Sequence, residues 1–115
     1  MTKQDEIMYK IIREIVSDKR KKGDTICRKD YELNANQMTG IFKILSERDI
    51  IEKAANSLYY ITGRSTKNAK ELCLSEISKR LNDVFKIAES GNIDKELLID
   101  FIKMLINDNA KRTDI

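Results

Sequence analysis

Apolar residues recur every three or four positions along most of the chain, which is the spacing of amphipathic helices. The first such stretch follows Thr2, which stands three residues before Asp5, the spacing of a reciprocal N-terminal cap. The basic run before Gly23 predicts the end of this first helix, because cations favour a helix C-terminus and glycine adopts positive φ. That run, residues 19–22, could alternatively contact phosphate. The apolar stripe of this helix comprises Ile7, Met8, Ile11, Ile12, Ile15 and Val16.

A second helix is predicted from Asn34, which has Gln37 at the capping distance. Its outward face is polar and carries no acidic residue before Glu47. Such a face can approach a polyanion closely and offer amide and hydroxyl groups to base edges, or it can simply be solvated. The inward stripe comprises Met38, Ile41, Phe42 and Leu45, and the outward face comprises Asn36, Thr39, Gly40 and Lys43.

Residues 50–54 and 58–61 have the composition of two strands around a turn at Ala55, Asn56 and Ser57. A two-stranded hairpin is not stable alone, so it must pack on the helices. The link at residues 24–33 has room for about one or two helical turns. Helix, link, helix and hairpin in this order predict a mainly α fold with a small β-hairpin: a winged helix-turn-helix over residues 1–64.

Two further helices are predicted in residues 65–108, broken near Gly91, which we expect at the left-handed position after the first of them. Their apolar surface exceeds what a monomer leaves exposed, which predicts a two-fold helical dimer interface. Packing onto residues 1–64 is the alternative. Residues 109–115 are expected to form a frayed tail. The candidate interface residues are Leu74, Ile77, Leu81, Val84, Phe85, Leu98, Phe101, Ile102 and Leu105.

Composition narrows the class of protein. The 115 residues include no Pro and only four Gly, and 36% are charged, which suits a small helical protein. No apolar run approaches the ~20 residues of a membrane span, and the start of the chain does not resemble a signal peptide, so we expect a cytoplasmic protein without membrane contact. There is no His, no CxxC pair and no Gly-rich phosphate loop, so we expect no metal, no cofactor and no enzymatic activity. Cys27 and Cys73 are expected to be reduced, packed thiols.

The positive charge is unevenly distributed. Residues 1–65 contain 13 Lys and Arg against 10 Asp and Glu, and residues 66–115 contain 9 of each, so the net charge of +3 lies wholly in the N-terminal part. This distribution favours an anionic partner for that part.

Several segments resemble the GntR family of bacterial transcriptional regulators. MYKIIREIVSDKRKKGD is similar to the family's first helix and turn, with Lys22 in place of a proline. YELNANQMTGIFKILSERDIIEK is similar to its Leu-Gly-Val-Ser-Arg-x-Thr-Val segment and the strand entry that follows, and Tyr59, Tyr60 and Ile61 match the returning strand. AESGNIDKELLIDFIKML is similar to the two-helix tail of the short YtrA-like subgroup. The resemblance covers nearly the whole chain and implies a dimeric DNA-binding regulator without a large effector domain.

The sequence also departs from the family pattern. The supporting helix is shorter by more than a turn, and Arg28 is the nearest counterpart of its DNA-contacting arginine. Ala35 stands where an arginine is usual, and residues 54–58 lack the arginine and both glycines of the family's wing. Either the protein reads DNA with a different set of amides, or the module has acquired another role.

The combined hypothesis is a dimeric, sequence-specific regulator of transcription, a repressor, whose partner is double-stranded DNA. The helix from Asn34 would enter the major groove, where an amide can bind adenine bidentately and Lys43 can bind guanine or phosphate. Basic residues around it would contact phosphates. The alternative is a winged-helix module that has lost DNA binding and docks a protein. The sequence does not indicate whether a small effector binds. The candidate DNA-binding residues are Arg28, Lys29, Asn34, Asn36, Gln37, Thr39, Lys43, Lys53, Asn56, Ser57 and Arg64.

Overall fold

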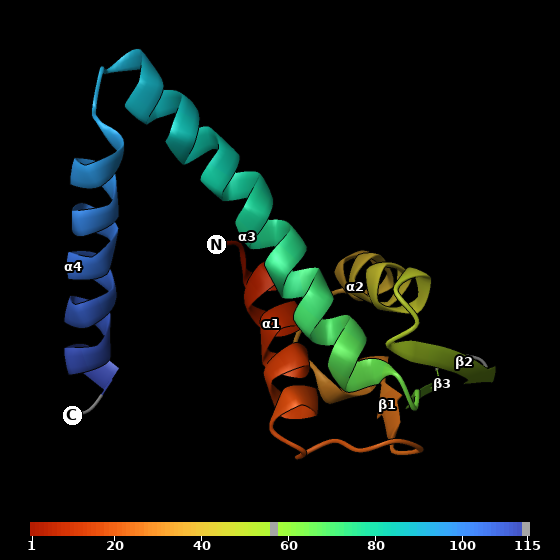
Figure 1. The fold of residues 1–115 in the computed structure, drawn as a ribbon. Coiled ribbons are helices and arrows are strands. Elements are labelled where there is room, and N and C mark those ends of the chain that lie inside the picture. Colours follow the sequence, from red (N-terminus) through yellow and green to blue (C-terminus); the bar gives the residue numbers. More distant parts are fainter. Residues whose placement is uncertain (56–57, 114–115) are drawn as a thin grey trace. The chain divides into compact units, whose positions relative to one another are not determined.

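The computed structural model describes residues 1–55 and 58–113, and it divides into two compact units, Met1–Ser75 and Glu76–Ile115. The predicted mainly helical fold with a small antiparallel sheet is confirmed (Figure 1). In chain order the elements are α1 (Lys3–Val16), β1 (Thr25–Cys27), the 3-10 turn η1 (Arg28–Asp30), α2 (Ala35–Glu47), β2 (Ile51–Ala55), β3 (Leu58–Ile61), α3 (Ser65–Ser90) and α4 (Lys95–Thr113).

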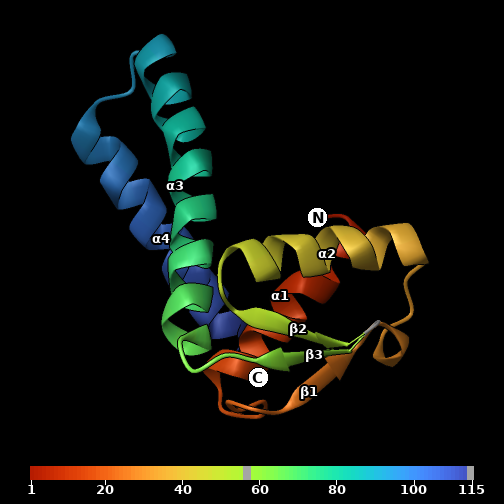
Figure 2. The ribbon, with the colours of Figure 1, turned by 90° about the vertical axis from the view of Figure 1, so that its right-hand side faces the viewer.

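The sheet has three strands in the order β1-β3-β2, and both pairings are antiparallel (Figure 2). The predicted hairpin of β2 and β3 is present, but β1 was not expected. Residues 24–33 were predicted to hold one or two helical turns; instead Ile26 pairs with Tyr59, and only residues 28–30 form a 3-10 turn. A strand of three residues is too short to show an alternating pattern, and its partner lies far along the chain.

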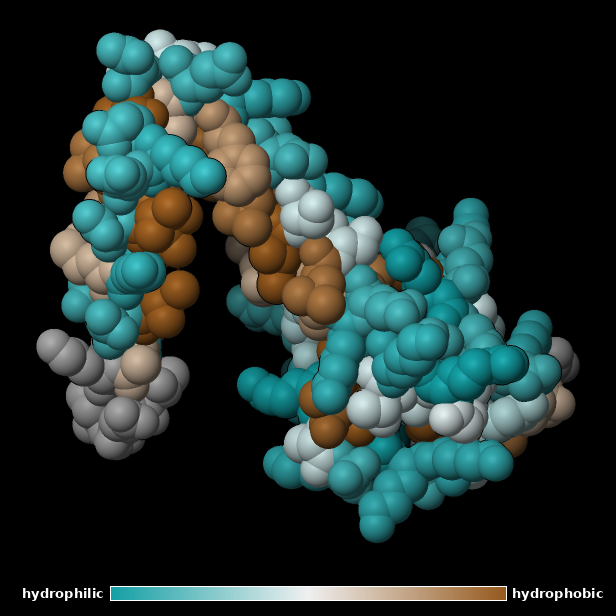
Figure 3. Space-filling model, in the orientation of Figure 1, coloured by the Kyte–Doolittle hydropathy of each residue, from teal (hydrophilic) through white to brown (hydrophobic). Residues whose placement is uncertain are grey.

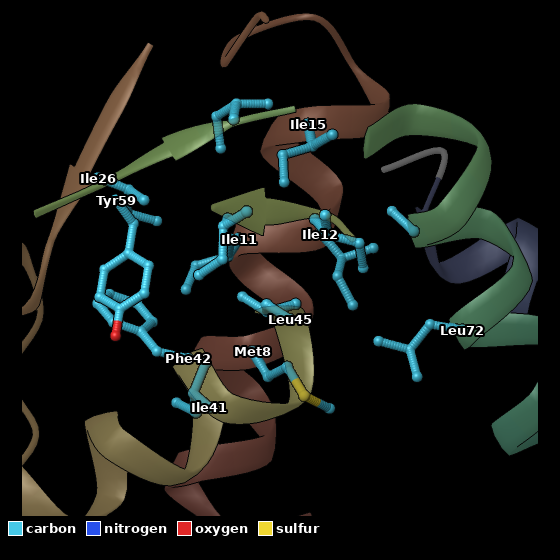
Figure 4. Packing of buried hydrophobic residues seen from close by; sticks show 14 of the residues in the cluster. Met8, Ile11, Ile12, Ile15, Ile26, Ile41, Phe42, Leu45, Tyr59 and Leu72 are labelled. Carbon is cyan, nitrogen blue, oxygen red and sulfur yellow. The ribbon is translucent and has the colours of Figure 1, made fainter. Parts of the chain in front are cut away.

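The core of the first unit is formed by the apolar stripes that the sequence indicates on α1 and α2 (Figure 4). Val16, at the end of the predicted stripe of α1, is the exception, since it is 37% exposed. The sheet covers the stripes from one side, where the rings of Phe42 and Tyr59 meet edge-on with centroids 4.7 Å apart. Ala69 and Leu72 of α3 are also buried in this core, so the first unit extends to Ser75 rather than to the expected boundary at residue 64.

Both predicted reciprocal caps are present. The Thr2 hydroxyl accepts a hydrogen bond from the Asp5 backbone N–H (3.1 Å), and Asn34 Oδ1 accepts one from the Gln37 N–H (2.8 Å). In each case the backbone N–H of the capping residue donates a hydrogen bond to the side chain of the helix's third residue. Two of the free N–H groups at each helix start are thereby satisfied, which fixes where α1 and α2 begin.

Three helices end in the same way, with an acidic or amide residue in the left-handed region. Asp18, Asp49 and Asn92 follow α1, α2 and α3 with φ of 63°, 56° and 55°. After α3, the Asn92 N–H donates to Glu89 O and the Ile93 N–H to Ala88 O, the paired bonds of a Schellman motif. The expectation that Gly91 takes this position is therefore wrong. Gly23 does have positive φ, but α1 ends earlier, at Val16.

The second unit consists of the later part of α3 and α4, with an apolar groove between them. Apolar side chains are exposed along both helices (Figure 3): Phe85 is 50% exposed and Phe101 51%. α4 continues to Thr113, past residue 108 where the frayed tail was expected to start. No helix among the described residues is long and apolar enough to span a membrane. The groove is lined by Leu81, Val84, Ile87, Ala88, Ile93, Leu97, Leu98, Phe101, Ile102 and Leu105.

Candidate nucleic-acid interface

The outward face of α2 presents a row of polar side chains. Asn36, Thr39 and Lys43 are exposed, whereas the residues of the opposite stripe are buried. No acidic residue lies in the first turn of α2. The free N–H groups at the helix start also give this end a partial positive charge. A polyanion can therefore approach the first half of α2 without meeting a like charge on it.

Two of the candidate residues, Asn34 and Gln37, also form the N-terminal cap of α2. Asn34 and Gln37 each use their side-chain oxygen in the reciprocal cap. Each oxygen has already accepted one backbone hydrogen bond, so an adenine bound bidentately would have to share that oxygen with the cap. Asn36 takes no part in the cap, so its donors and its acceptor are not shared with it.

The hairpin next to α2 contributes Lys53, which is exposed on β2. The pairing of β2 with β3 shifts between Lys53 and Ala55, which marks a bulge near the end of the strand. On the neighbouring strand the Tyr60 hydroxyl donates to the Glu52 carboxylate. The candidate residues Asn56 and Ser57 lie outside the described residues.

The remaining cations differ in how far they are already engaged. Lys29 is exposed on η1, and the Arg28 side chain lies outside what the structure describes. Arg64 Nε lies 2.7 Å from Asp49 Oδ2, so part of its charge is offset within the protein, although its side chain is 78% exposed. A contact between Arg64 and phosphate would have to share the guanidinium with Asp49.

Three acidic residues outside the predicted set of site residues lie beside this face. Glu47, Asp49 and Glu52 line a groove between α2 and the hairpin, which also contains Lys43 and Lys53. The three carboxylates come from the end of α2, the loop after it and β2, within six consecutive residues, so they are neighbours in the sequence as well. They make the C-terminal end of the face less attractive to phosphate than its N-terminal end.

The basic run after α1 is divided between two roles. Arg20 Nε lies 2.6 Å from Glu14 Oε2, and its guanidinium stacks over the Tyr31 ring, 5.8 Å from the centroid. Arg20 is therefore structural, and it holds the loop after α1 against the residues that follow η1. Lys19, Lys21 and Lys22 are exposed and remain available to an anion.

The cysteines and possible metal ligands add no second site. Cys27 and Cys73 are free and half-buried, and burial raises the pKa of the Cys73 thiol. Within residues 1–55 and 58–113, no group of three or more His, Cys, Asp or Glu side chains could hold a metal ion. The exposed amide, hydroxyl and ammonium groups on α2 can form hydrogen bonds and ion pairs with a bound partner.

Two solved structures share this fold. A candidate transcriptional regulator of the GntR family from Bacteroides thetaiotaomicron aligns with a TM-score of 0.68 over 94% of this chain and 99% of its own, at 14% sequence identity. A GntR family transcriptional regulator from Listeria monocytogenes aligns with a TM-score of 0.59 over 90% of this chain and 95% of its own, at 22% identity. No model of a protein family and no curated protein matches the sequence. At these identities the likeness establishes the fold, a winged helix followed by two C-terminal helices.

Proposed function

We propose that this protein is a DNA-binding regulator of transcription related to the short YtrA-like subgroup of the GntR family, acting as a homodimeric repressor. The observation that carries the proposal is the exposed polar row of Asn36, Thr39 and Lys43 on a well-capped helix beside a hairpin. The likeness of the whole fold to two structures described as GntR regulators supports it.

In the proposed complex α2 enters the major groove. A helix with its side chains is ~10–12 Å across, which fits a groove ~12 Å wide. Asn36 binds the N6 and N7 positions of an adenine, and Lys43 binds guanine or a phosphate. Lys29 and Lys53, on either side of α2 in the sequence, contact the phosphate backbone and position the helix.

The exposed apolar faces of α3 and α4 in the second unit support dimerisation. Side chains such as Phe85 and Phe101 are about half exposed, and a second copy would cover them. A two-fold dimer carries two copies of α2 and reads two half-sites, ~34 Å apart for one turn of duplex. A dimer bound across its own upstream region blocks access to that duplex, so repression is the proposed direction.

A labelled duplex from the protein's own upstream region, titrated at increasing salt, tests the proposal. We expect binding at least ~10³-fold tighter than to a scrambled duplex of the same composition. We also expect the affinity to fall steeply as salt rises, because bound lysines displace counterions from the phosphates. Equal binding to both duplexes would contradict a sequence-specific regulator.

A protein-docking module is the second candidate, and the acidic groove favours it. Glu47, Asp49 and Glu52 lie where phosphates would approach the C-terminal end of α2, and they suit a basic partner surface instead. A partner that is retained by the natural protein but lost when Glu47 and Glu52 are changed to lysine would support this function. The same preparation would then show no salt-sensitive shift of any duplex.

A further inference from the structure

The side chain of Gln4, in the first turn of α1, reaches Gly40 on α2. Gln4 Nε2 is only 2.8 Å from the position that a β-carbon would occupy on Gly40, and Gln4 Cδ is 3.9 Å from it. Figure 2 shows the start of α1 beside the middle of α2. The separation of 2.8 Å is closer than a side-chain carbon tolerates, so a side chain at residue 40 would push the end of the flexible Gln4 side chain away from this position.

Gly40 occupies the middle of the polar row that is proposed to read DNA. It follows Asn36 by four residues and precedes Lys43 by three, so all three point to the same side of the helix. Asn36 and Lys43 are exposed, and Gly40 and Gln4 are half-buried. The space beside Gly40 is therefore occupied by an amide from a different helix.

The Gln4 carboxamide starts from a fixed backbone position and makes no hydrogen bond of its own within the part of the chain that the structure describes. Its neighbours Thr2 and Asp5 form the reciprocal cap that fixes the first turn of α1. Among the described residues, none forms a hydrogen bond with the Gln4 side chain, which keeps an acceptor oxygen and two N–H donors. One acceptor and one donor side by side is the pattern that an adenine edge requires in the major groove.

We propose that Gln4 is a specificity-determining residue that hydrogen-bonds a base edge, an adenine, beside the base read by Asn36. The inference rests on the proposed function, because it requires α2 to enter the major groove. Gly40 is the positioning residue in this arrangement. It leaves room for the amide beside the helix, and a glycine inside a helix is otherwise unfavourable compared with alanine.

A double-mutant cycle with Gln4→Ala and Gly40→Ala tests the contact, using the labelled upstream duplex as probe. Gln4→Ala removes the amide, and Gly40→Ala displaces it because its new methyl group takes the same space. We expect each single variant to lose affinity by about tenfold per half-site, and the double variant to lose no more than Gln4→Ala alone. Gln4→Met, which keeps the length without hydrogen bonding, should resemble Gln4→Ala.

Two further readouts separate a base contact from a loss of structure or of a phosphate contact. Substituting each base pair of the duplex should show that Gln4→Met relaxes the preference at one position per half-site. The dependence of log affinity on log salt should keep its slope, because no phosphate contact is lost. Gly40→Ala should fold at least as stably as the natural chain, since alanine is the better helix former.

The outcomes also distinguish this inference from the proposed function. A natural chain that binds the upstream and scrambled duplexes equally would overturn both. Specific binding by the natural chain together with equal affinity of Gln4→Met would overturn the Gln4 contact alone. A uniform loss over all base pairs with a shallower salt slope would also overturn it, because that result assigns Gln4 to the phosphate backbone.

Discussion

The hydroxyl of Thr62 donates a hydrogen bond to the backbone carbonyl of Asp49, with 2.6 Å between the two oxygens. The same carbonyl also accepts a bond from Asn68 Nδ2 at 3.2 Å. Asp49 follows α2, Thr62 follows β3 and Asn68 lies in α3, so one carbonyl group links the ends of two elements to a third. The orientation of α2 relative to the hairpin depends in part on this junction.

Thr62→Val should destabilise the first unit by about 1 kcal/mol, because it removes a nearly buried hydrogen bond while keeping the shape of the side chain. Thr62 is 7% exposed, so water cannot easily replace the lost partner. Urea denaturation followed by circular dichroism measures the change. Thr25→Val, at an exposed strand position, serves as control and should shift the free energy of unfolding by less than ~0.5 kcal/mol. A Thr62 variant as stable as this control would show that the junction is not needed.

Replacing Asp18 by alanine should lower stability by about 1 kcal/mol, whereas replacing it by glycine should not. Asp18 has φ of 63°, a region where a β-carbon is strained and where aspartate is favoured over alanine by its short polar side chain. Thermal unfolding of the two variants is the measurement. Equal midpoints for Asp18→Ala and Asp18→Gly would argue against a left-handed end of α1.

Stability should fall as the pH rises from 10 to 12, in part because of Tyr31. Burial raises the pKa of Tyr31 from 10.0 to about 12, against the opposing positive charge of Arg20 over its ring. The folded state therefore holds the proton more tightly than the unfolded state, so the stabilisation is complete below pH 10 and is lost above it.

The variant Tyr31→Phe should show a weaker decline of stability over that pH range. In the natural protein the Tyr31 hydroxyl is buried without a hydrogen-bond partner among the described residues, so removing it should not destabilise the protein at neutral pH. Tyr60→Phe is the comparison, because the hydrogen bond from Tyr60 to Glu52 also raises the pKa of Tyr60. A decline unchanged in Tyr31→Phe would contradict the role of its burial.

Asn36→Ala should weaken binding to the upstream duplex by about 1–3 kcal/mol per half-site and leave the salt slope unchanged, since it removes a base contact. Lys53→Met should weaken binding to all duplexes alike and lower the salt slope by about 1 per protomer. Fluorescence anisotropy at several salt concentrations measures both. Lys86→Met, on α3 in the second unit, is the matched control and should bind like the natural chain. Undiminished binding by Asn36→Ala would remove α2 as the proposed reading helix.

Phe101→Asp should convert the proposed dimer into a monomer, because a charge would be placed in an apolar interface. Light scattering should give the natural protein about twice the chain mass of 13.4 kDa and the variant a single chain mass. Lys103→Asp adds an acid to the same helix at a polar position and should remain dimeric. If the natural chain is itself monomeric, or Phe101→Asp stays dimeric, the second unit is not the interface.

Local relations along the sequence determined most of the secondary structure. The caps at Thr2 and Asn34 depend on residues three positions away, and the buried stripes of α1 and α2 follow from a repeat of three or four. Such relations hold wherever the helix forms, so they can be read before the fold is known. The hairpin followed in the same way from two short apolar runs around a turn.

Tertiary structure alone decided the features that join distant residues. β1 exists because Ile26 finds a partner in Tyr59, and Leu72 brings part of α3 into the first core. The close approach of Gln4 to Gly40 likewise depends on elements far apart in the sequence. Periodicity specifies which side of a helix is buried, but the neighbours of the exposed side depend on how the elements pack. For this reason the sequence could indicate the polar row on α2, and only the fold could show which side chains from elsewhere complete it.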